Sequence, residues 1–313
     1  MRVLVTGGAG FIGANLCRFL ASSPAFESVV ALDDLSTGFR SNLNGHSGVE
    51  LVEGSILDDV VLRPLVAASD AVVHLAARPS VPRSIADPMA THRVNVEGML
   101  AVLEAARSRP TPPHVIFSSS SSVYGNNPVL PKHEALTPMP RSPYAASKLA
   151  GEAYLLSYQE SFGVPALAFR FFNVFGPLQA PGHAYAAVIP AFVHAALNGQ
   201  PATIFGDGSQ SRDFTYVGTV AEVISAALRG RVVSAKPVNL AFGSRVTLLE
   251  LLELLEGKLG YSVERNHLAT RAGDVQDSQA DGAALRVLFP QVTSTSLDVG
   301  LGATIDWMRD AGI

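Results

Sequence analysis

The chain has 313 residues, of which 48% are hydrophobic and 16% are charged, and its formal net charge is −4. A chain of this size and composition can bury a large core, and its charge provides no basic surface for nucleic acid or for a membrane. The single cysteine, Cys17, excludes a disulfide framework and a cysteine-rich metal site, and we expect it to be packed in the core. No apolar stretch approaches the roughly 20 residues that span a bilayer, and the first residues lack the layout of a signal peptide. We therefore predict a cytoplasmic globular protein without a bound metal ion.

Strands and helices alternate through the first half of the chain. Apolar runs rich in β-branched residues predict strands at 2–6, 28–33, 49–54, 71–77, 114–119 and 164–172. Helical spacing of apolar residues predicts helices at 11–22, 56–68, 87–107 and 142–161. Because continuously apolar strands alternate with helices, we predict an α/β fold with a doubly wound parallel sheet of Rossmann type.

The pattern changes after about Gly176, where proline, glycine and histidine cluster and shorter mixed elements follow. We expect a first domain of residues 1–175, to which the segment near 213–243 returns with a helix and a strand. Residues 176–212 and 244–313 are expected to form a smaller, mixed α/β C-terminal lobe.

A glycine-rich turn joins the first predicted strand to the first predicted helix. Gly7, Gly10 and Gly13 in TGGAGFIG have the spacing that lets a backbone approach a pyrophosphate at a helix N-terminus. Asp33 ends the second strand twenty residues after Gly13, where a carboxylate binds both ribose hydroxyls of NAD and repels the 2′-phosphate of NADP. The glycines alone are also compatible with a tight turn. Together with Asp33 they predict an NAD site.

Five serines, Ser118 to Ser122, stand in a row at the exit of the predicted strand 114–119. Serine runs usually mark flexible loops. Here a buried strand precedes them and a turn follows, which places the hydroxyls at the carboxyl edge of the sheet, where open α/β sheets bind ligands.

Tyr144 and Lys148 in PRSPYAASK are four residues apart and share one face of a predicted helix. A tyrosine acts as a general base only if its pKa falls from about 10 toward 7, which corresponds to roughly 4 kcal/mol of preferential stabilisation of the phenolate. We expect the Lys148 ammonium and the positive charge of oxidised nicotinamide to lower this pKa.

The spacing G-x-x-G-x-x-G resembles the short-chain dehydrogenase/reductase superfamily, and the chain's length and its second lobe resemble the extended branch of that superfamily. The segment from Ser118 to Gly125 resembles the S-S-S-x-[ST]-V-Y-G motif of nucleotide-sugar 4-epimerases, and the resemblance to UDP-hexose 4-epimerases runs from residue 1 to beyond residue 300. It implies that Ser120 is the catalytic hydroxyl beside Tyr144 and that Lys148 completes the catalytic set.

The same resemblance implies the contacts of NAD. The implied cofactor-binding residues are Gly7, Gly10, Phe11, Ile12, Gly13, Asp33, Ser55, Ile56, Leu75, Ala76, Ala77, Asn95, Ser118, Tyr144 and Lys148. The chain departs from the family at Ser55, where an acid that contacts adenine is usual. His74, which ends a buried strand, could serve as a base, but we expect a packed core residue.

Residues 121 and 122 distinguish between two reaction types. The related sugar-nucleotide 4,6-dehydratases carry an Asp-Glu pair where Ser121 and Ser122 stand, and without those acids the loss of water lacks its acid and base. The resemblance therefore implies simple epimerisation. Tyr144, assisted by Ser120, takes the proton of the sugar 4-hydroxyl while hydride passes from C4 to NAD, and the turned 4-keto sugar receives the hydride on its other face.

The resemblance also implies a UDP-sugar site. Its residues are Ser80, Ser120, Ser122, Tyr144, Asn173, Val188, Arg212, Arg271, Asp274 and Ser278. Arginine suits a diphosphate because it offers paired N–H donors, although each arginine alone could be a solvated surface side chain.

Ser278 stands where the family carries either a large tyrosine, which excludes an N-acetyl group, or a small residue, which admits one. The stretches 80–88 and 179–190 resemble bacterial UDP-N-acetylglucosamine 4-epimerases. UDP-glucuronate 4-epimerases place an arginine where Ala180 stands, and His183 or Arg83 could replace it. We predict UDP-GlcNAc/UDP-GalNAc epimerisation.

Three alternatives stay open, namely a UDP-glucose 4-epimerase, a UDP-glucuronate 4-epimerase and a non-catalytic NAD-sensing protein. The last would be expected to have lost Tyr144 or Lys148. The resemblance also implies a homodimer formed by the two long helices at 87–107 and 142–161.

Overall fold

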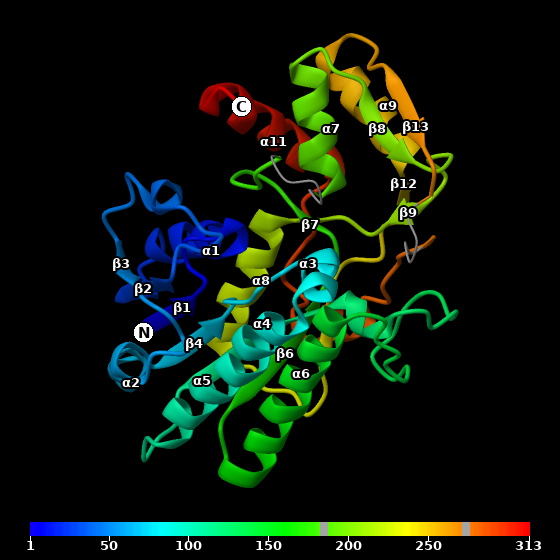
Figure 1. Ribbon diagram of the computed structural model, residues 1–313. Coiled ribbons are helices and arrows are strands. Elements are labelled where there is room, and N and C mark those ends of the chain that lie inside the picture. The colour runs from blue at the N-terminus through cyan, green and yellow to red at the C-terminus, as the bar shows by residue number, and fades with distance from the viewer. Residues whose placement is uncertain (182–186, 271–275) are drawn as a thin grey trace.

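A seven-stranded parallel sheet forms the centre of the larger part of the molecule in this computed structural model, which describes residues 1–181, 187–270 and 276–313 (Figure 1). The strand order is β11-β6-β5-β4-β1-β2-β3. The strands are β1 (Arg2–Thr6), β2 (Ser28–Asp33), β3 (Val49–Glu53), β4 (Ala71–His74), β5 (His114–Ser120), β6 (Ala166–Phe171) and β11 (Val238–Leu240). The order reverses between β1 and β4, which is the point where a ligand crevice opens beyond the strand ends. The predicted fold class is confirmed.

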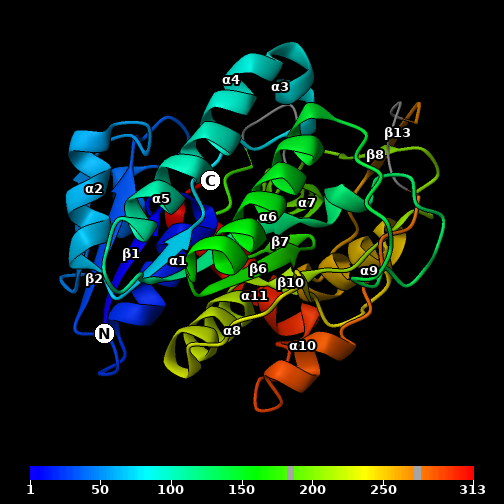
Figure 2. The same cartoon turned by 90° about the horizontal axis from the view of Figure 1, so that it is seen from below.

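Helices cover both faces of this sheet (Figure 2). One face carries α1 (Phe11–Ala21), α8 (Val217–Gly230) and α10 (Ala283–Leu288). The other carries α2 (Asp59–Ala68), α5 (Gly98–Arg107) and α6 (Pro143–Phe162). Cys17 of α1 is fully buried, as expected, and burial raises the pKa of its thiol.

The helix predicted at 87–107 is continuous from residue 88 to residue 107 and contains one π-helical turn. Its parts are α4 (Pro88–His92), the π-helical turn η2 (Arg93–Glu97) and α5, and the short helix α3 (Val81–Ala86) precedes them. Asp87 caps α4 by accepting a hydrogen bond from the Ala90 N–H at 3.0 Å, so its own backbone is extended and separates α3 from α4. Single π-turns occur often at functional sites, and this one holds Asn95.

The smaller lobe has its own apolar core, at the upper right of Figure 1. Its helices are α7 (Val188–Leu197), α9 (Leu248–Leu259) and α11 (Leu297–Ala311), and its parallel strand pair is β8 (Ala202–Phe205) with β13 (Arg265–Leu268). Short pairs join the parts, β7 (Val174–Phe175) with β10 (Thr215–Tyr216) and β9 (Ser211–Arg212) with β12 (Val246–Thr247). Short 3₁₀ turns are η1 (Arg40–Leu43) and η3 (Ser121–Tyr124).

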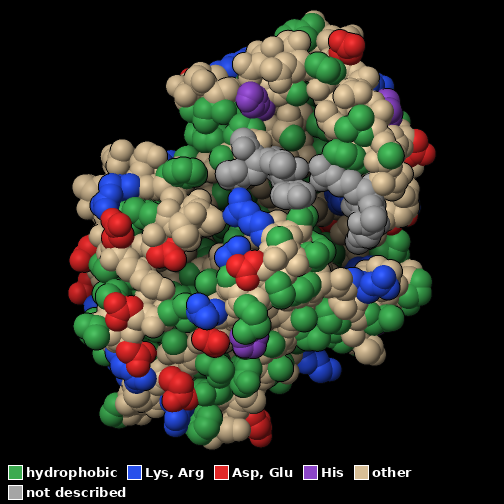
Figure 3. Space-filling view, viewed as in Figure 1, with side chains coloured by type: hydrophobic (Ala, Val, Ile, Leu, Met, Phe, Trp, Pro, Cys, Tyr) green, Lys and Arg blue, Asp and Glu red, His purple; other side chains and the backbone are tan. Residues whose placement is uncertain are grey.

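Two apolar cores and the return of α8 and β11 to the large sheet support the predicted segmentation. We propose one domain of residues 1–175 with 213–243 and a second of 176–212 with 244–313. Acidic and basic side chains are interspersed over the lower part of the face in Figure 3. Within the described ranges, no helix is long and apolar enough to cross a lipid bilayer.

Two helical glycines give a matched test of how closely α6 packs on the sheet. A Cβ atom on Gly151 of α6 would lie 2.5 Å from Cζ of the buried Phe117 ring, whereas one on Gly257 of α9 would meet nothing within 4 Å. We expect Gly151→Ala to lower the free energy of unfolding by about 1–3 kcal/mol. Gly257→Ala should raise it by about 0.5–1 kcal/mol, because alanine is the better helix former. Urea unfolding measures both, and equal stabilisation by the two variants would contradict the close packing.

Candidate active site

The end of β5 meets the first two turns of α6. Lys148 is 3% exposed, and its Nζ donates a 2.7 Å hydrogen bond to the carbonyl oxygen of Ser118. Tyr144 lies in the first turn of α6, where Ser142 caps the helix, and the Ser120 hydroxyl lies close enough to the Tyr144 side chain to lower its pKa. The structure thus brings together Ser120, Tyr144 and Lys148, the three residues predicted to be catalytic.

The pKa values at this edge differ from the expectation for Tyr144. Burial raises the Tyr144 pKa, and the Ser120 hydrogen bond lowers it in part. Burial also lowers the Lys148 pKa to about 7, against the opposing influence of the Glu152 carboxylate. A half-deprotonated lysine is a weak source of positive charge at neutral pH. Lowering the Tyr144 pKa toward 7 therefore depends on the nicotinamide charge, which NAD supplies when bound.

The glycine-rich turn has the geometry of a pyrophosphate cradle. Gly7 has φ +71°, and a Cβ atom there would lie 2.7 Å from the backbone nitrogen of Ala76. A Cβ atom on Gly13 would lie 2.1 Å from the carbonyl oxygen of Gly7. Gly10 is the N-cap of α1 and offers no side-chain cap, so the first N–H groups of the helix are available to an anion. A dinucleotide pyrophosphate fits this turn.

Asp33 ends β2 beside this turn. Its two carboxylate oxygens accept hydrogen bonds from the N–H groups of Ala9 at 2.9 Å and Leu35 at 2.8 Å. Burial raises the pKa of Asp33, and these hydrogen bonds oppose the rise. Each oxygen retains a second lone pair, so the carboxylate can still accept hydrogen bonds from two ribose hydroxyls.

The other predicted NAD residues surround the same crevice. Those in loops after β3 and β4, or at the start of α1, are Phe11, Ile12, Ser55, Ile56, Leu75, Ala76 and Ala77. Asn95 is 3% exposed, and its side chain donates to Ser147 Oγ at 2.9 Å and accepts from the Arg78 N–H at 2.7 Å. The π-turn thereby ties α6 to the loop after β4.

His74 is a packed core residue, as expected. Its ring is 1% exposed, its Nδ1 lies 2.7 Å from Thr6 Oγ1, and burial lowers its pKa to about 3. A neutral ring of such low basicity is a poor proton acceptor at neutral pH, so it is not the catalytic base.

Two predicted sugar-side residues carry unusual features. Ser122 Oγ is buried and has no hydrogen-bond partner among the described residues. Ser80, the N-cap of α3, has φ +94°, a region that non-glycine residues rarely adopt and that recurs at functional sites. Asn173 donates to the Asp213 carbonyl oxygen at 3.3 Å, and Val188 begins α7.

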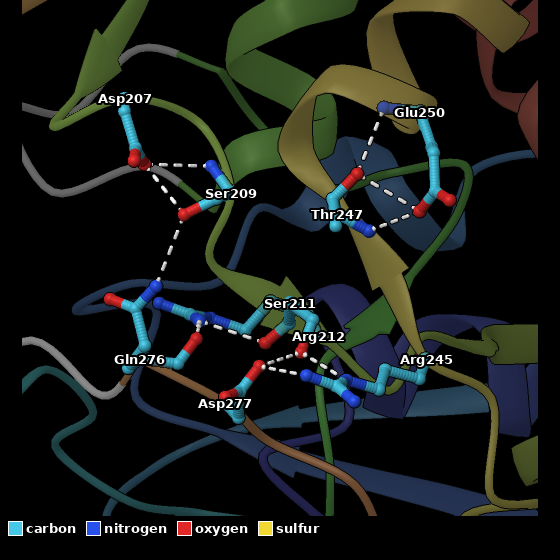
Figure 4. A network of polar contacts seen from close by, with 9 residues as sticks. All are labelled: Asp207, Ser209, Ser211, Arg212, Arg245, Thr247, Glu250, Gln276 and Asp277. Carbon is cyan, nitrogen blue, oxygen red and sulfur yellow. Dashed lines mark hydrogen bonds and ion pairs between the residues drawn. The ribbon is translucent and has the colours of Figure 1, made fainter.

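Arg212 lies in a small polar network of the smaller lobe with Ser211, Arg245 and Asp277 (Figure 4), and the backbone of Ser278 bonds to Ser211. Arg212 Nη1 donates to the carbonyl oxygen of Ser211 at 2.9 Å, and the Ser278 N–H donates to the same oxygen at 3.1 Å. Arg245 pairs with Asp277 at 3.0 Å. The Ser278 segment is thus fixed beside the arginine predicted to bind diphosphate.

Arg271 and Asp274, also predicted to bind the nucleotide, lie outside the described residues. Sequence reasoning missed Asp213, whose buried carboxylate accepts from the N–H groups of Ala280 at 3.0 Å and Gly243 at 3.1 Å. Asp213 could have been found from the sequence because it directly follows Arg212, which was predicted to bind the diphosphate. It missed Glu152 too, although Glu152 follows Lys148 by four residues on the same helix face.

Comparison with known proteins identifies the family. The NAD dependent epimerase/dehydratase family matches residues 3–241. The chain belongs to this family. It is 36% identical to a UDP-glucose 4-epimerase of Mycolicibacterium smegmatis over 99% of both chains.

Two solved structures are similar along nearly the whole chain. One is a UDP-N-acetylglucosamine 4-epimerase from Methanobrevibacter ruminantium in complex with UDP-N-acetylmuramic acid, with 36% identity, a TM-score of 0.93 and coverage of 99% of this chain and 98% of that one. The other is a UDP-glucuronic acid 4-epimerase from Bacillus cereus in complex with UDP-glucuronic acid and NAD, with 32% identity, a TM-score of 0.89 and coverage of 99% and 100%. The prediction of an epimerase with NAD as its cofactor is confirmed.

The buried Lys148 predicts a specific pH dependence of stability. Its pKa is about 7 in the folded protein against 10.5 for an ordinary lysine, so folding releases a proton between these values. The free-energy cost of burying the charged form of Lys148 is therefore absent above pH 10.5 and reaches its full value below pH 7. We expect the unfolding free energy of the NAD-free wild type to rise with pH in this window relative to Lys148→Met, by up to about 1 kcal/mol per pH unit. A difference between the two proteins that is independent of pH in urea unfolding would contradict the lowered pKa.

Proposed function

We propose that the protein interconverts UDP-N-acetylglucosamine (UDP-GlcNAc) and UDP-N-acetylgalactosamine (UDP-GalNAc) by epimerisation at C4, with NAD as cofactor. The observation that carries this proposal is the convergence of Ser120, Tyr144 and Lys148 at the end of β5. Membership of the NAD dependent epimerase/dehydratase family and relatives named as UDP-sugar 4-epimerases support the reaction class.

The side chains at this edge fit oxidation and reduction of one sugar carbon. Tyr144 accepts the proton of the 4-hydroxyl in its phenolate form, which the nicotinamide charge favours when NAD is bound, and the Ser120 hydroxyl holds the phenolate oxygen in place for this transfer. NAD, when bound, supplies a reversible hydride acceptor. Ser122 offers its unpartnered hydroxyl to the sugar. Because residues 121 and 122 are serines, no carboxylic acid or carboxylate stands there to drive the loss of water.

Three features favour an N-acetylated hexose. Ser278 is small and half-buried, so it leaves space beside the sugar C2 that a tyrosine would fill. Its segment is held by backbone bridges between Ser211 and Asp277 and between Lys132 and Ala280, which fix the position of Ser278. The similarity to the UDP-N-acetylglucosamine 4-epimerase of Methanobrevibacter ruminantium agrees with this choice.

The alternatives fit the chain less well. Ala180 stands where a glucuronate epimerase would carry an arginine, which disfavours a carboxylated hexose. A UDP-glucose 4-epimerase would leave the space at Ser278 unused. An NAD-sensing protein without activity has no need of the Ser120–Tyr144–Lys148 cluster, which the chain retains.

The hexose assignment is tested by following UDP-GlcNAc and UDP-glucose in parallel through their anomeric proton signals. We expect the wild type to convert UDP-GlcNAc faster. Ser278→Tyr should lower its turnover of UDP-GlcNAc by at least about tenfold and spare UDP-glucose, since filling a pocket with an ill-fitting group costs roughly 1–3 kcal/mol. Ser278→Ala is the matched control and should retain both activities. Equal turnover of UDP-GlcNAc by Ser278→Tyr and the wild type would refute the role of Ser278.

We further propose a homodimer formed through the helix at 87–107, which comprises α4, η2 and α5, and the helix at 142–161, which lies in α6. Tyr154 and Phe162 of α6 are exposed, as are Met89 of α4 and Ile85 of α3, and apolar side chains exposed on neighbouring helices are typical of an interface. Light scattering should give twice the chain mass of 32.9 kDa, and Tyr154→Glu with Met89→Glu should return the mass to that of one chain. A wild-type mass of one chain at all concentrations would refute the dimer.

A further inference from the structure

A buried ion pair lies directly behind the catalytic edge. Glu152 of α6 and Arg170 of β6 have side chains that are 4% and 3% exposed. Arg170 donates to both carboxylate oxygens of Glu152, through Nε at 2.8 Å and Nη2 at 2.8 Å. A buried carboxylate requires such pairing, because an uncompensated charge in the interior is strongly destabilising.

The pair is connected to the serine run. Ser119 Oγ donates to Glu152 Oε1 at 2.5 Å. Side chains alternate along a strand, so Ser119 faces α6 on the same side as Phe117, whose ring lies 5.0 Å from Lys148 Nζ. Ser119 stands between Ser118, whose carbonyl oxygen binds Lys148, and Ser120, which binds Tyr144.

Three contacts therefore join the end of β5 to one face of α6. Tyr144, Lys148 and Glu152 follow one another at intervals of four residues, which places them on successive turns. Their partners are the consecutive residues Ser120, Ser118 and Ser119. Of the three contacts, only that of Glu152 lies away from the predicted substrate and cofactor.

We propose that Glu152 is a positioning residue of the epimerase reaction, whose carboxylate locks the end of β5 against α6 and supports the positive charge of Lys148. It acts through its neighbours and does not touch the reacting atoms. This inference rests on the proposed function for its catalytic consequence, but its electrostatic part concerns the chain alone.

The groups around Lys148 define this electrostatic role. The Glu152 carboxylate raises the Lys148 pKa against the lowering that burial causes. On β4, His74 is neutral at pH 7 because its pKa is about 3, and on α6 the Tyr144 phenol is neutral as well because its pKa is raised. On β6, Arg170 is a fixed cation, whose charge Glu152 balances. Without the carboxylate, the lowering of the Lys148 pKa by burial would be unopposed, which would favour the neutral amine.

The outer side of the pair is also anchored. The Arg170 guanidinium lies 4.7 Å from the centroid of the Tyr124 ring, and the Tyr124 hydroxyl donates to Asn239 Oδ1 of β11 at 2.7 Å. Asn239 is fully buried. These contacts therefore link α6 through β6 to β11. Glu152 is the member of this chain of contacts that lies nearest to the proposed catalytic residues.

Glu152→Gln tests the proposal, because glutamine keeps the shape and an acceptor oxygen but removes the charge. The chain has four lysines, so protein labelled with ¹³C at lysine Cε gives few signals, and Lys148→Met assigns the one of interest. We expect Glu152→Gln to move the Lys148 titration midpoint at least about one pH unit lower, which is a tenfold loss of the charged fraction above that midpoint. Glu152→Gln combined with Arg170→Gln removes both charges of the ion pair and should show the same lowered Lys148 midpoint, because the Glu152 carboxylate is the group that raises the Lys148 pKa.

Activity provides the second readout. With UDP-GlcNAc, the alkaline limb of the kcat–pH profile of Glu152→Gln should move in the same direction, and kcat above the midpoint should fall about tenfold, with KM within about twofold of the wild type. Glu104→Gln is the matched control. Glu104 forms an ion pair with Arg107 at 2.7 Å on a half-exposed helix face, and this variant should leave both readouts unchanged.

The outcomes separate the two proposals. An unchanged Lys148 midpoint in folded Glu152→Gln would overturn the electrostatic role, and an unchanged kcat–pH profile alongside a shifted midpoint would overturn the positioning role. A shifted midpoint in a protein that turns over none of the UDP-hexoses even as wild type would instead refute the proposed function.

Discussion

The edge of the sheet that we propose as catalytic depends on one buried lysine. The Lys148 ammonium lies between β5 and α6, hydrogen-bonded to the Ser118 carbonyl oxygen and above the Phe117 ring. Placing a cation in such an environment requires α6 to approach β5 closely, and Gly151, one turn further along, permits the approach because it has no side chain to meet Phe117. The same close approach brings Tyr144 within reach of Ser120. The close approach of α6 to β5 thus has two consequences. It buries Lys148, which lowers its pKa to about 7, and it brings the proposed catalytic residues together.

The remainder of the site is arranged around this edge by backbone contacts. The glycine-rich turn after β1 lies at the reversal of strand order, where the crevice for the dinucleotide opens. From the other side, the segment that carries Ser278 is bridged to Ser211 and to the Lys132 region. Because these bridges join backbone atoms, they hold the backbone at position 278 in place whichever side chain it carries. The role that we propose for residue 278 in hexose preference is therefore separable from the chemistry that we propose for Tyr144.

The sequence alone predicts the parts of the site that depend on local pattern. The βα alternation, the glycine turn, Asp33 at the end of its strand and the four-residue spacing of Tyr144 and Lys148 all follow from short-range periodicity, and the structure assembles them as expected. Glu152 and Arg170 escape such reasoning because they are eighteen residues apart on a helix and a strand, and only the packed fold reveals that both are buried. The π-turn at Asn95 escapes it because one extra residue in a helix leaves no periodic signal.

The pKa of Tyr144 is a further property that the spacing of residues in the sequence does not predict. The four-residue interval places a lysine beside a tyrosine, but burial acts on both side chains and disfavours the charged form of each. How much charge Lys148 retains depends on Glu152 and on solvent exclusion, neither of which can be read from the Y-x-x-x-K motif. The motif predicts the place of the proposed chemistry, whereas the charge of Lys148 there depends on the surrounding fold.

The most direct test of this account is conversion of UDP-GlcNAc by the purified protein in D₂O, followed by proton NMR. The account predicts that the anomeric signal of UDP-GalNAc appears and that its H4 carries protium throughout, because the hydrogen removed from C4 is returned to the same carbon without exchange with solvent. Deuterium at C4 of the product, or no UDP-GalNAc at all, would contradict it.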